Sequence, residues 1–122
     1  MAKRSIRLGN TMKYKTVFKF APKVKQRPRM TRRGRVFTPA QTLEFEALVR
    51  EAWEHEMIEG DCVVTINFMK DKFEVTVEAT DKYEPTKLRG DIDNYVKAVL
   101  DGLNGTAFVD DKFIRKMTVT KK

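Results

Sequence analysis

Four carboxylates and one lysine lie close together in the sequence of this 122-residue chain. They are Asp91, Asp93, Lys97 and the adjacent pair Asp110 and Asp111. The whole chain carries a formal net charge of +8, so this group of acids is unusual for its context. Carboxylate oxygens are ligands that Mg²⁺ prefers, and a basic protein attracts polyanions. The pattern predicts a divalent-metal site that acts on a nucleic-acid backbone.

Metal ions held by carboxylates can cut a phosphodiester bond. Mg²⁺ keeps several water ligands while it binds one or two carboxylates and the phosphate of a substrate. Two such ions about 4 Å apart can activate a water molecule and stabilise the leaving 3′ oxygen. Lys97 would neutralise the phosphate in the transition state or orient the water.

The spacing of the acids decides whether they can converge. Two residues inside one helix and two positions apart point about 200° away from each other. Asp91 and Asp93 can therefore meet only if Asp91 precedes the helix and Asp93 lies in its first turn, with Gly90 easing the turn. Asp93 and Lys97, at i and i+4, share a face. Asp111 joins them only if the chain doubles back.

Each acid also has a structural interpretation that needs no metal. Asp91 could be only a helix N-cap, and Asp93 could be a helix-dipole residue paired to Lys97. Asp110 and Asp111 could form only a solvated turn. No calcium-binding loop starts at Asp91, because its required positions hold unsuitable residues, and neither a P-loop nor a dinucleotide-binding fingerprint is present.

The positive charge is concentrated in the first third of the chain. Residues 1–40 contain 13 Lys or Arg and no Asp or Glu, and the remainder has a net charge of −5. Arginine forks suit phosphate oxygens, so we predict a DNA-binding segment. Its residues are Lys25, Arg27, Arg29, Arg32, Arg33 and Arg35. The run from Arg32 to Arg35 fits a hairpin tip or an exposed loop. The alternatives are a disordered basic linker, or a tail that only maintains solubility.

Composition and periodicity predict one α/β (α+β) domain, with a small mixed β-sheet and two main helices. Residues 1–11 are expected to be a flexible basic arm and residues 12–122 the domain. The predicted elements, in order, are strand 12–20, helix 38–59, a central strand 62–69, its hairpin partner 73–80, helix 92–104 and a final strand 113–119.

Two details of the first helix are specific predictions. Thr38 would cap it, Pro39 would lie in its first turn, and Gly60 would end it. His55, the only histidine, would be a surface residue among acids. The sequence shows no apolar run that could cross a membrane and no secretory signal, and its single cysteine, Cys62, excludes an intramolecular disulfide. These features favour a cytoplasmic location.

Several motifs together resemble one family. They are Arg27–Pro39, Gly-Asp-Ile-Asp-Asn-Tyr-Val-Lys at 90–97, Leu-Asp-Gly-Leu-Asn at 100–104 and Val-Asp-Asp at 109–111. This set is similar to the RusA-type Holliday-junction resolvases found in prophages, over about residues 18–120. The resemblance implies a magnesium-dependent homodimer that nicks four-way DNA junctions in recombination and repair. Mn²⁺ is the alternative to Mg²⁺. The resemblance also implies that Asp91, Asp93 and Asp111 bind metal and that Lys97 is the essential lysine.

Two other functions remain open at this point. One is a metal nuclease that prefers flaps, forks or RNA. The other is a non-catalytic basic module whose acids only cap a helix. The sequence departs from the shortest members of the family by an extra hairpin-like stretch before Asp91 and by an early end after the last motif. Neither departure falls within the acidic motif.

Overall fold

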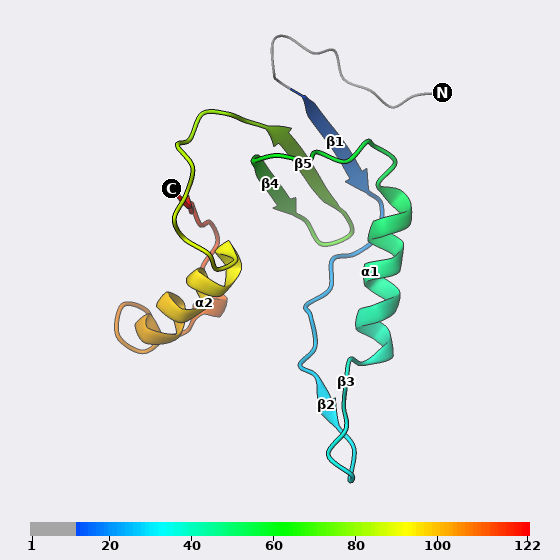
Figure 1. Ribbon diagram of the computed structural model, residues 1–122. Helices are drawn as coiled ribbons and strands as arrows, with labels where there is room; N and C mark the ends of the chain where they lie inside the picture. Colours follow the sequence, from blue (N-terminus) through cyan, green and yellow to red (C-terminus); the bar gives the residue numbers. More distant parts are fainter. Residues whose placement is uncertain (1–11) are drawn as a thin grey trace. The chain divides into compact units, whose positions relative to one another are not determined.

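The computed structural model describes residues 12–122. The predicted arm, residues 1–11, lies outside the described residues. The chain divides into two compact units, one ending at Asp81 and the other comprising Lys82–Lys122, and each is described separately. The first contains β1 (Lys13–Phe18), β2 (Arg29–Met30), β3 (Val36–Phe37), α1 (Ala40–Ala52), β4 (Cys62–Phe68) and β5 (Phe73–Ala79) (Figure 1). The second contains α2 (Ile92–Leu103) and the 3₁₀ turn η1 (Asp111–Phe113).

A three-stranded antiparallel sheet forms the centre of the first unit. Its strand order is β1-β5-β4, so β5 is the middle strand. The β4–β5 hairpin was predicted, but the prediction of a central strand at 62–69 is wrong, because β4 lies at the edge. A β-branched run suits both positions, and the pairing is decided by β1, which bonds to β5 over its whole length.

The two faces of the sheet differ in chemistry. Along β1, the buried Tyr14 and Phe18 lie on one face of the sheet and the lysines lie on the other, as a period of two predicts. Tyr14, Phe18 and Phe73 are buried, and the rings of Phe18 and Phe73 stack with centroids 4.7 Å apart. On the other face Lys15 and Glu74 form a partly exposed ion pair at 3.8 Å. The core therefore lies on the aromatic face, beneath α1.

Replacing Phe18 by alanine is expected to destabilise the protein by about 3–5 kcal/mol. Phe18 is 1% exposed and its ring lies near those of Phe20, Trp53 and Phe73, so the substitution leaves a cavity that these rigid rings cannot fill. Urea denaturation followed by tryptophan fluorescence measures the change. Val24→Ala is the control, because Val24 is 90% exposed and its loss should leave the midpoint unchanged. Equal midpoints for the two variants would contradict this assignment of the core.

Helix α1 differs from its prediction at both ends. It is preceded by Pro39, which serves as the N-cap without a side-chain cap bond, so Thr38 does not cap it. It ends at Ala52 instead of reaching Glu59. The reason is tertiary, since Trp53 adopts an extended backbone and lays its ring parallel to that of Phe18 at 6.5 Å. Packing against the sheet outweighs the helix propensity of the residues that follow.

His55 was predicted to be a surface residue, and the structure shows it half-buried. Its Nε2 lies 2.9 Å from Thr16 Oγ1 and 3.1 Å from the Lys15 carbonyl oxygen. Its ring stacks on Tyr14, with centroids 4.9 Å apart, and meets Trp53 edge-on. This position follows from the early end of α1, which lets residues 53–55 fold back on β1.

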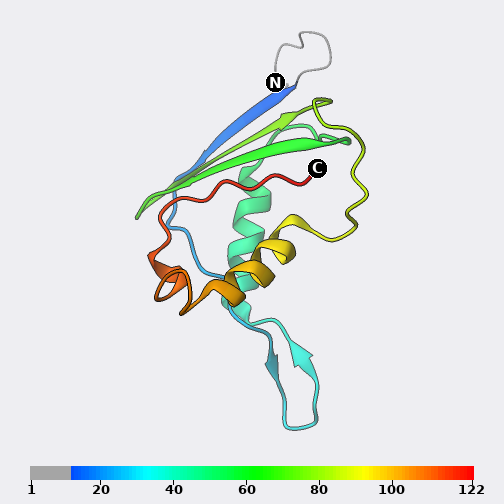
Figure 2. The same cartoon turned by 90° about the vertical axis from the view of Figure 1, so that its left-hand side faces the viewer.

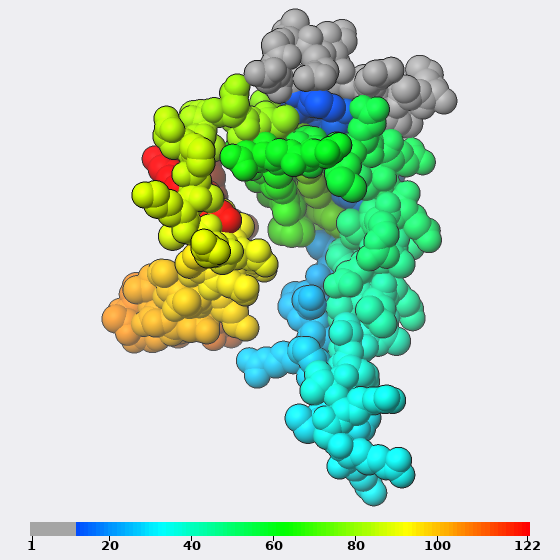
Figure 3. Space-filling model, viewed as in Figure 1, coloured from blue at the N-terminus to red at the C-terminus, as the bar shows by residue number. Residues whose placement is uncertain are grey.

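Strands β2 and β3 form a short hairpin that projects from the unit, shown in cyan in Figures 1 and 3. The Thr31 amide donates to the Arg35 carbonyl at 2.8 Å, and the Gly34 amide donates to the Thr31 carbonyl at 2.9 Å. Gly34 has a φ of 81°, a conformation that L side chains rarely adopt. Of the two options left by the sequence, the hairpin tip is confirmed.

The second unit is organised by α2, whose bounds agree closely with the prediction of 92–104. Asp91 is its N-cap and Asn104 its C-cap. Gly105 follows with a φ of 77°, and its amide donates to the Phe108 carbonyl at 2.7 Å. Asn104 and Phe108 form an isolated parallel bridge, which begins the return of the chain. Figure 2 shows the C-terminal segment running back past α2.

The predicted final strand at 113–119 is wrong. Residues 111–113 form the 3₁₀ turn η1, and residues 114–122 are extended without a ladder to any described strand. A β-strand exists only through hydrogen bonds to a partner, so alternating apolar residues alone do not create one. Two helices with a small sheet confirm the α+β class. No helix between residues 12 and 122 is long and apolar enough to cross a membrane.

Candidate metal and nucleic-acid sites

Asp91 occupies the N-cap of α2 through its backbone. Its carbonyl oxygen accepts from the amides of Asn94 at 3.1 Å and Tyr95 at 3.2 Å. Its side chain makes no capping hydrogen bond. An N-cap aspartate normally uses a carboxylate oxygen for this purpose. No described residue engages the exposed carboxylate of Asp91, so the interpretation of Asp91 as only a side-chain cap loses its support.

Asp93 and Lys97 lie one turn apart on α2, and both are exposed. Their i, i+4 spacing would allow an ion pair, yet no ion pair to either residue occurs within residues 12–122. Asp93 also gains from the helix dipole in the first turn. The carboxylate of Asp93 and the ammonium of Lys97 are both available to a substrate.

The structure separates the roles of Asp110 and Asp111, which the sequence left open. The Asp110 carboxylate caps η1 by accepting from the Lys112 amide at 3.0 Å. Asp111 is the first residue of that turn, and it contributes its carbonyl oxygen to the Ile114 amide at 3.0 Å. No hydrogen bond or ion pair engages its carboxylate within the described part of the chain. Asp110 has a structural use, and Asp111 has a free carboxylate.

The three free carboxylates are not assembled into one cluster. No group of three His, Cys, Asp or Glu among residues 12–122 is close enough to hold a metal ion. Asp91 and Asp93 stand together at the start of α2, a helix of 12 residues and hence about 18 Å long, whereas the return toward Asp111 starts at its other end. Their oxygen donors nonetheless fit Mg²⁺, which needs only one or two carboxylates besides phosphate and water.

Three residues position the backbone that precedes Asp91, and only Gly90 was noticed in the sequence. The Gly90 amide donates to the Tyr95 hydroxyl at 3.0 Å, and Lys121 Nζ donates to the Gly90 carbonyl at 3.1 Å. Gly90 has no positive φ, so its role is not conformational freedom. It is needed because a Cβ there would lie 2.9 Å from the Tyr95 ring. Tyr95 and Lys121 lie five and 31 residues after Gly90, and no sequence pattern indicates contacts at these spacings.

If Asp91 takes part in cleavage, Gly90→Ala is expected to slow that cleavage by about 10- to 100-fold. The added Cβ would push away the Tyr95 ring and shift Asp91 with it. Because Tyr95 is 41% exposed and can move outward, stability should change by only about 1 kcal/mol. Single-turnover cleavage and thermal unfolding separate the two effects. Gly102→Ala is the matched control, since a Cβ at Gly102 meets nothing within 4 Å. Equal cleavage rates for the two variants would contradict a positioning role for Gly90.

The predicted DNA-binding residues lie on the β2–β3 hairpin and the segment before it. Arg29 belongs to β2, and Arg32, Arg33 and Arg35 surround the turn at Gly34. All are exposed, and none forms an ion pair with a described residue. Lys25 differs, because its Nζ lies 3.8 Å from a Glu46 carboxylate oxygen. An exposed pair of that length is weak, so Lys25 can still turn to phosphate.

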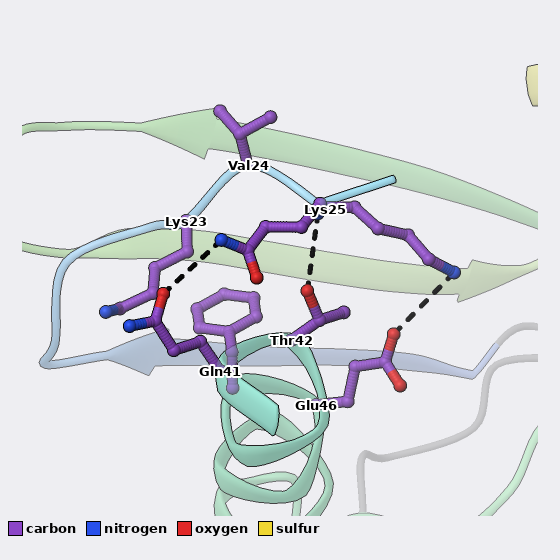
Figure 4. Close-up of a pocket in the computed structure, with 8 residues that line it drawn as sticks. Lys23, Val24, Lys25, Gln41, Thr42 and Glu46 are labelled. Carbon is purple, nitrogen blue, oxygen red and sulfur yellow. Dashed lines mark hydrogen bonds and ion pairs between the residues drawn. The ribbon is translucent and has the colours of Figure 1, made fainter. Parts of the chain in front are cut away.

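The segment before the hairpin is fastened to the start of α1, as Figure 4 shows. The Gln26 amide donates to Oγ1 of the buried Thr42 at 3.3 Å, and Gln26 Nε2 donates to Gln41 Oε1 at 3.4 Å. A small pocket lies at this junction, with Val24 and Phe45 among its lining residues. This anchor could not be predicted from the sequence, because residues 26 and 42 are brought together only in the folded chain. The anchor fixes the base of the β2–β3 hairpin with its four arginines, Arg29, Arg32, Arg33 and Arg35 (the arginine hairpin).

The model of the family described as endodeoxyribonuclease RusA matches residues 19–122. That range includes the arginine hairpin, the acidic residues of α2 and the turn at Asp111. No curated protein and no solved structure gives a significant match.

Proposed function

Because the chain belongs to the RusA endodeoxyribonuclease family, we propose that it is a magnesium-dependent nuclease that resolves four-way DNA junctions by paired nicks. Asp91, Asp93 and Asp111 hold the metal, Lys97 assists the transfer, and the arginine hairpin grips the DNA. Mn²⁺ would substitute for Mg²⁺. The enzyme would serve recombination and repair, in a prophage setting and in the cytoplasm.

One observation carries this proposal: the acids of the motif are not used by the fold. Asp91 makes no side-chain cap bond, and Asp93 forms no ion pair with Lys97 or with any other described residue. The neighbouring Asp110 shows the contrast, because its carboxylate does cap a turn. Exposed carboxylates at the start of α2, in a chain of net charge +8, fit a metal-dependent site for a polyanion.

The residues of this chain would act in distinct ways. Bound Mg²⁺ would supply Lewis-acid chemistry, polarising a phosphodiester and lowering the pKa of a water molecule. Asp91, at the N-cap of α2, and Asp93, in its first turn, would provide oxygen ligands, and Asp111 would add a third. Lys97, one helical turn from Asp93, is placed to donate to a phosphate oxygen as negative charge builds there. Gly90, Tyr95 and Lys121 keep Asp91 in position.

We also propose that the active form is a homodimer. A four-way junction with two-fold symmetry is resolved only when two strands are cut, and a two-fold protein dimer presents one site to each strand. Sedimentation of the protein alone and with a junction tests this directly. A monomer that makes both nicks at independent rates would contradict it.

The central experiment uses a synthetic four-way junction and a panel of flap, fork, linear duplex and RNA substrates. Each is incubated with protein in Mg²⁺, Mn²⁺, Ca²⁺ or EDTA, and the nicks are mapped. We expect symmetric nicks in the junction with Mg²⁺ or Mn²⁺, and binding without cleavage in Ca²⁺. Preferential cleavage of flaps, forks or RNA would favour a nuclease of other specificity. Binding without cleavage in every metal would favour a non-catalytic module.

A further inference from the structure

The β2–β3 hairpin has an apolar side that the proposed grip on phosphate does not use. Its antiparallel register pairs Met30 with Val36 and Arg29 with Phe37. Cross-strand partners project from the same face of a ribbon, and consecutive residues project from opposite faces. Met30 and Val36 therefore form a pair on one face. They are 68% and 61% exposed, although the hairpin is an ordered element closed by Gly34.

The charge of the β2–β3 hairpin indicates the kind of partner that its apolar pair would contact. The first acidic residue of the chain is Glu44, so the ribbon and its approach are wholly basic. Arg32 and Arg33 lie in the turn itself, within a few residues of Met30 and Val36 on either side. Forked donors at that spacing bind the phosphates of a nucleic-acid backbone. An apolar pair beside such donors would meet the sugars and bases of a nucleic acid whose phosphates they bind.

We propose that the hairpin inserts its Met30–Val36 pair between bases of branched DNA while the tip arginines hold the flanking phosphates. Proteins that kink DNA commonly push apolar side chains, methionine among them, into a base step and unstack it. The cost of unstacking is lowest where bases are already poorly stacked, as at the crossover of a four-way junction. The pair would thus help the protein select branched over linear DNA. This inference rests on the proposed function and assigns part of its substrate selectivity to the hairpin.

The test uses a four-way junction that carries 2-aminopurine at the crossover, whose fluorescence rises when the base unstacks. Full-length protein is added in Ca²⁺, and binding and fluorescence are recorded together. The wild-type protein should raise the fluorescence. Met30→Ser combined with Val36→Ser should abolish most of that rise and reduce the preference for junction over duplex by about tenfold. The salt dependence of binding should stay unchanged, because no phosphate contact is lost.

The matched control combines Met57→Ser with Val24→Ser, which removes one methionine and one valine that are 82% and 90% exposed and lie outside the hairpin. It should behave like the wild type. An unchanged fluorescence rise in the hairpin variant would overturn the inference, as would a wild-type protein that binds without any rise. A change of oligomeric state in the hairpin variant would instead assign the pair to a contact between protein chains.

Failure of the inference is distinct from failure of the proposed function. Suppose that the wild type and the hairpin variant both cleave the junction in Mg²⁺ and that neither unstacks its bases. That result would contradict the inference and would still support the proposed nuclease function. Absence of junction binding by the wild-type protein would remove both.

Discussion

Asp93→Asn is expected to lower junction cleavage by more than about 100-fold while leaving junction binding intact. Loss of a residue that only orients a metal ligand typically costs about 10- to 100-fold, so loss of a ligand should cost more. The amide keeps the shape of the side chain and removes its charge. Stability should fall by less than about 1 kcal/mol, because Asp93 is exposed and its main structural use is the helix dipole. Single-turnover cleavage in Mg²⁺ and gel-shift binding in Ca²⁺ measure the two quantities.

Asp101→Asn is the matched control for this change. Asp101 lies on α2, is exposed and undergoes the same loss of charge, yet it lies outside the proposed metal site. It should cut at the wild-type rate. The pair Asp110→Asn and Asp111→Asn extends the comparison, since only Asp111 is proposed to touch metal and only Asp110 caps a turn. Cleavage by Asp93→Asn at the wild-type rate would remove the metal-site proposal.

Changing Arg32 and Arg33 together to glutamine is expected to weaken junction binding by at least about tenfold at physiological salt. Both residues are exposed at the turn and have no ion pair with a described residue, so both are free to contact phosphate. If each neutralises one phosphate, the slope of log K against log salt should become shallower by about 1.8. Fluorescence anisotropy with a labelled junction, repeated over a range of salt concentrations, gives both the affinity and the slope.

Lys70→Gln with Lys72→Gln provides the control for the loss of two positive charges. These lysines flank Asp71 in the exposed turn between β4 and β5, where the local charge is lower than at the hairpin tip. The net charge of the protein changes equally in the two double variants. If the hairpin binds phosphate specifically, only the arginine variant should lose affinity and show a shallower slope of log K against log salt. Equal losses in both variants would mean that the arginines act only through the general charge of the protein.

The elements that the sequence predicted best are those with strong local patterns. Alternation over residues 12–20 identified β1, and the β-branched and alternating runs on either side of Lys70–Lys72 identified the β4–β5 hairpin. The bounds of α2 followed from Asp91 at its start and Asn104-Gly105 at its end. In each case the signal lies within a few residues, so no distant contact is needed to interpret it.

The predictions that failed depended on distant contacts. Helix α1 stops at Ala52 because Trp53 packs on Phe18, and a residue 35 positions away leaves no mark on the local pattern. His55 settles against Thr16 for the same reason. The segment 113–119 alternates as a strand does but finds no partner among the described strands.

The acids of residues 90–111 show the same contrast between what local patterns predict and what distant contacts decide. Their types and spacing, read from the sequence alone, predicted a metal-binding motif and placed Asp91 before the helix and Asp93 in its first turn. The family model matches residues 19–122, a range that includes these acids. Only the folded chain showed which carboxylates are free, because a cap or an ion pair depends on where a side chain points. It decided that Asp110 caps a turn, and that the Tyr95 ring requires glycine at position 90.

The sequence by itself determined the α+β class, with two helices and a small sheet, and it predicted carboxylates for a metal and arginines for phosphate. Residue type and local spacing are enough for that, since they set charge, periodicity and capping. The tertiary structure decided which strand is central, where α1 ends, that the arginines stand on a projecting hairpin, and that Lys121 supports the residue before Asp91. Each of these depends on contacts between residues far apart in the chain, which form only when burial and hydrogen bonding select one arrangement among many.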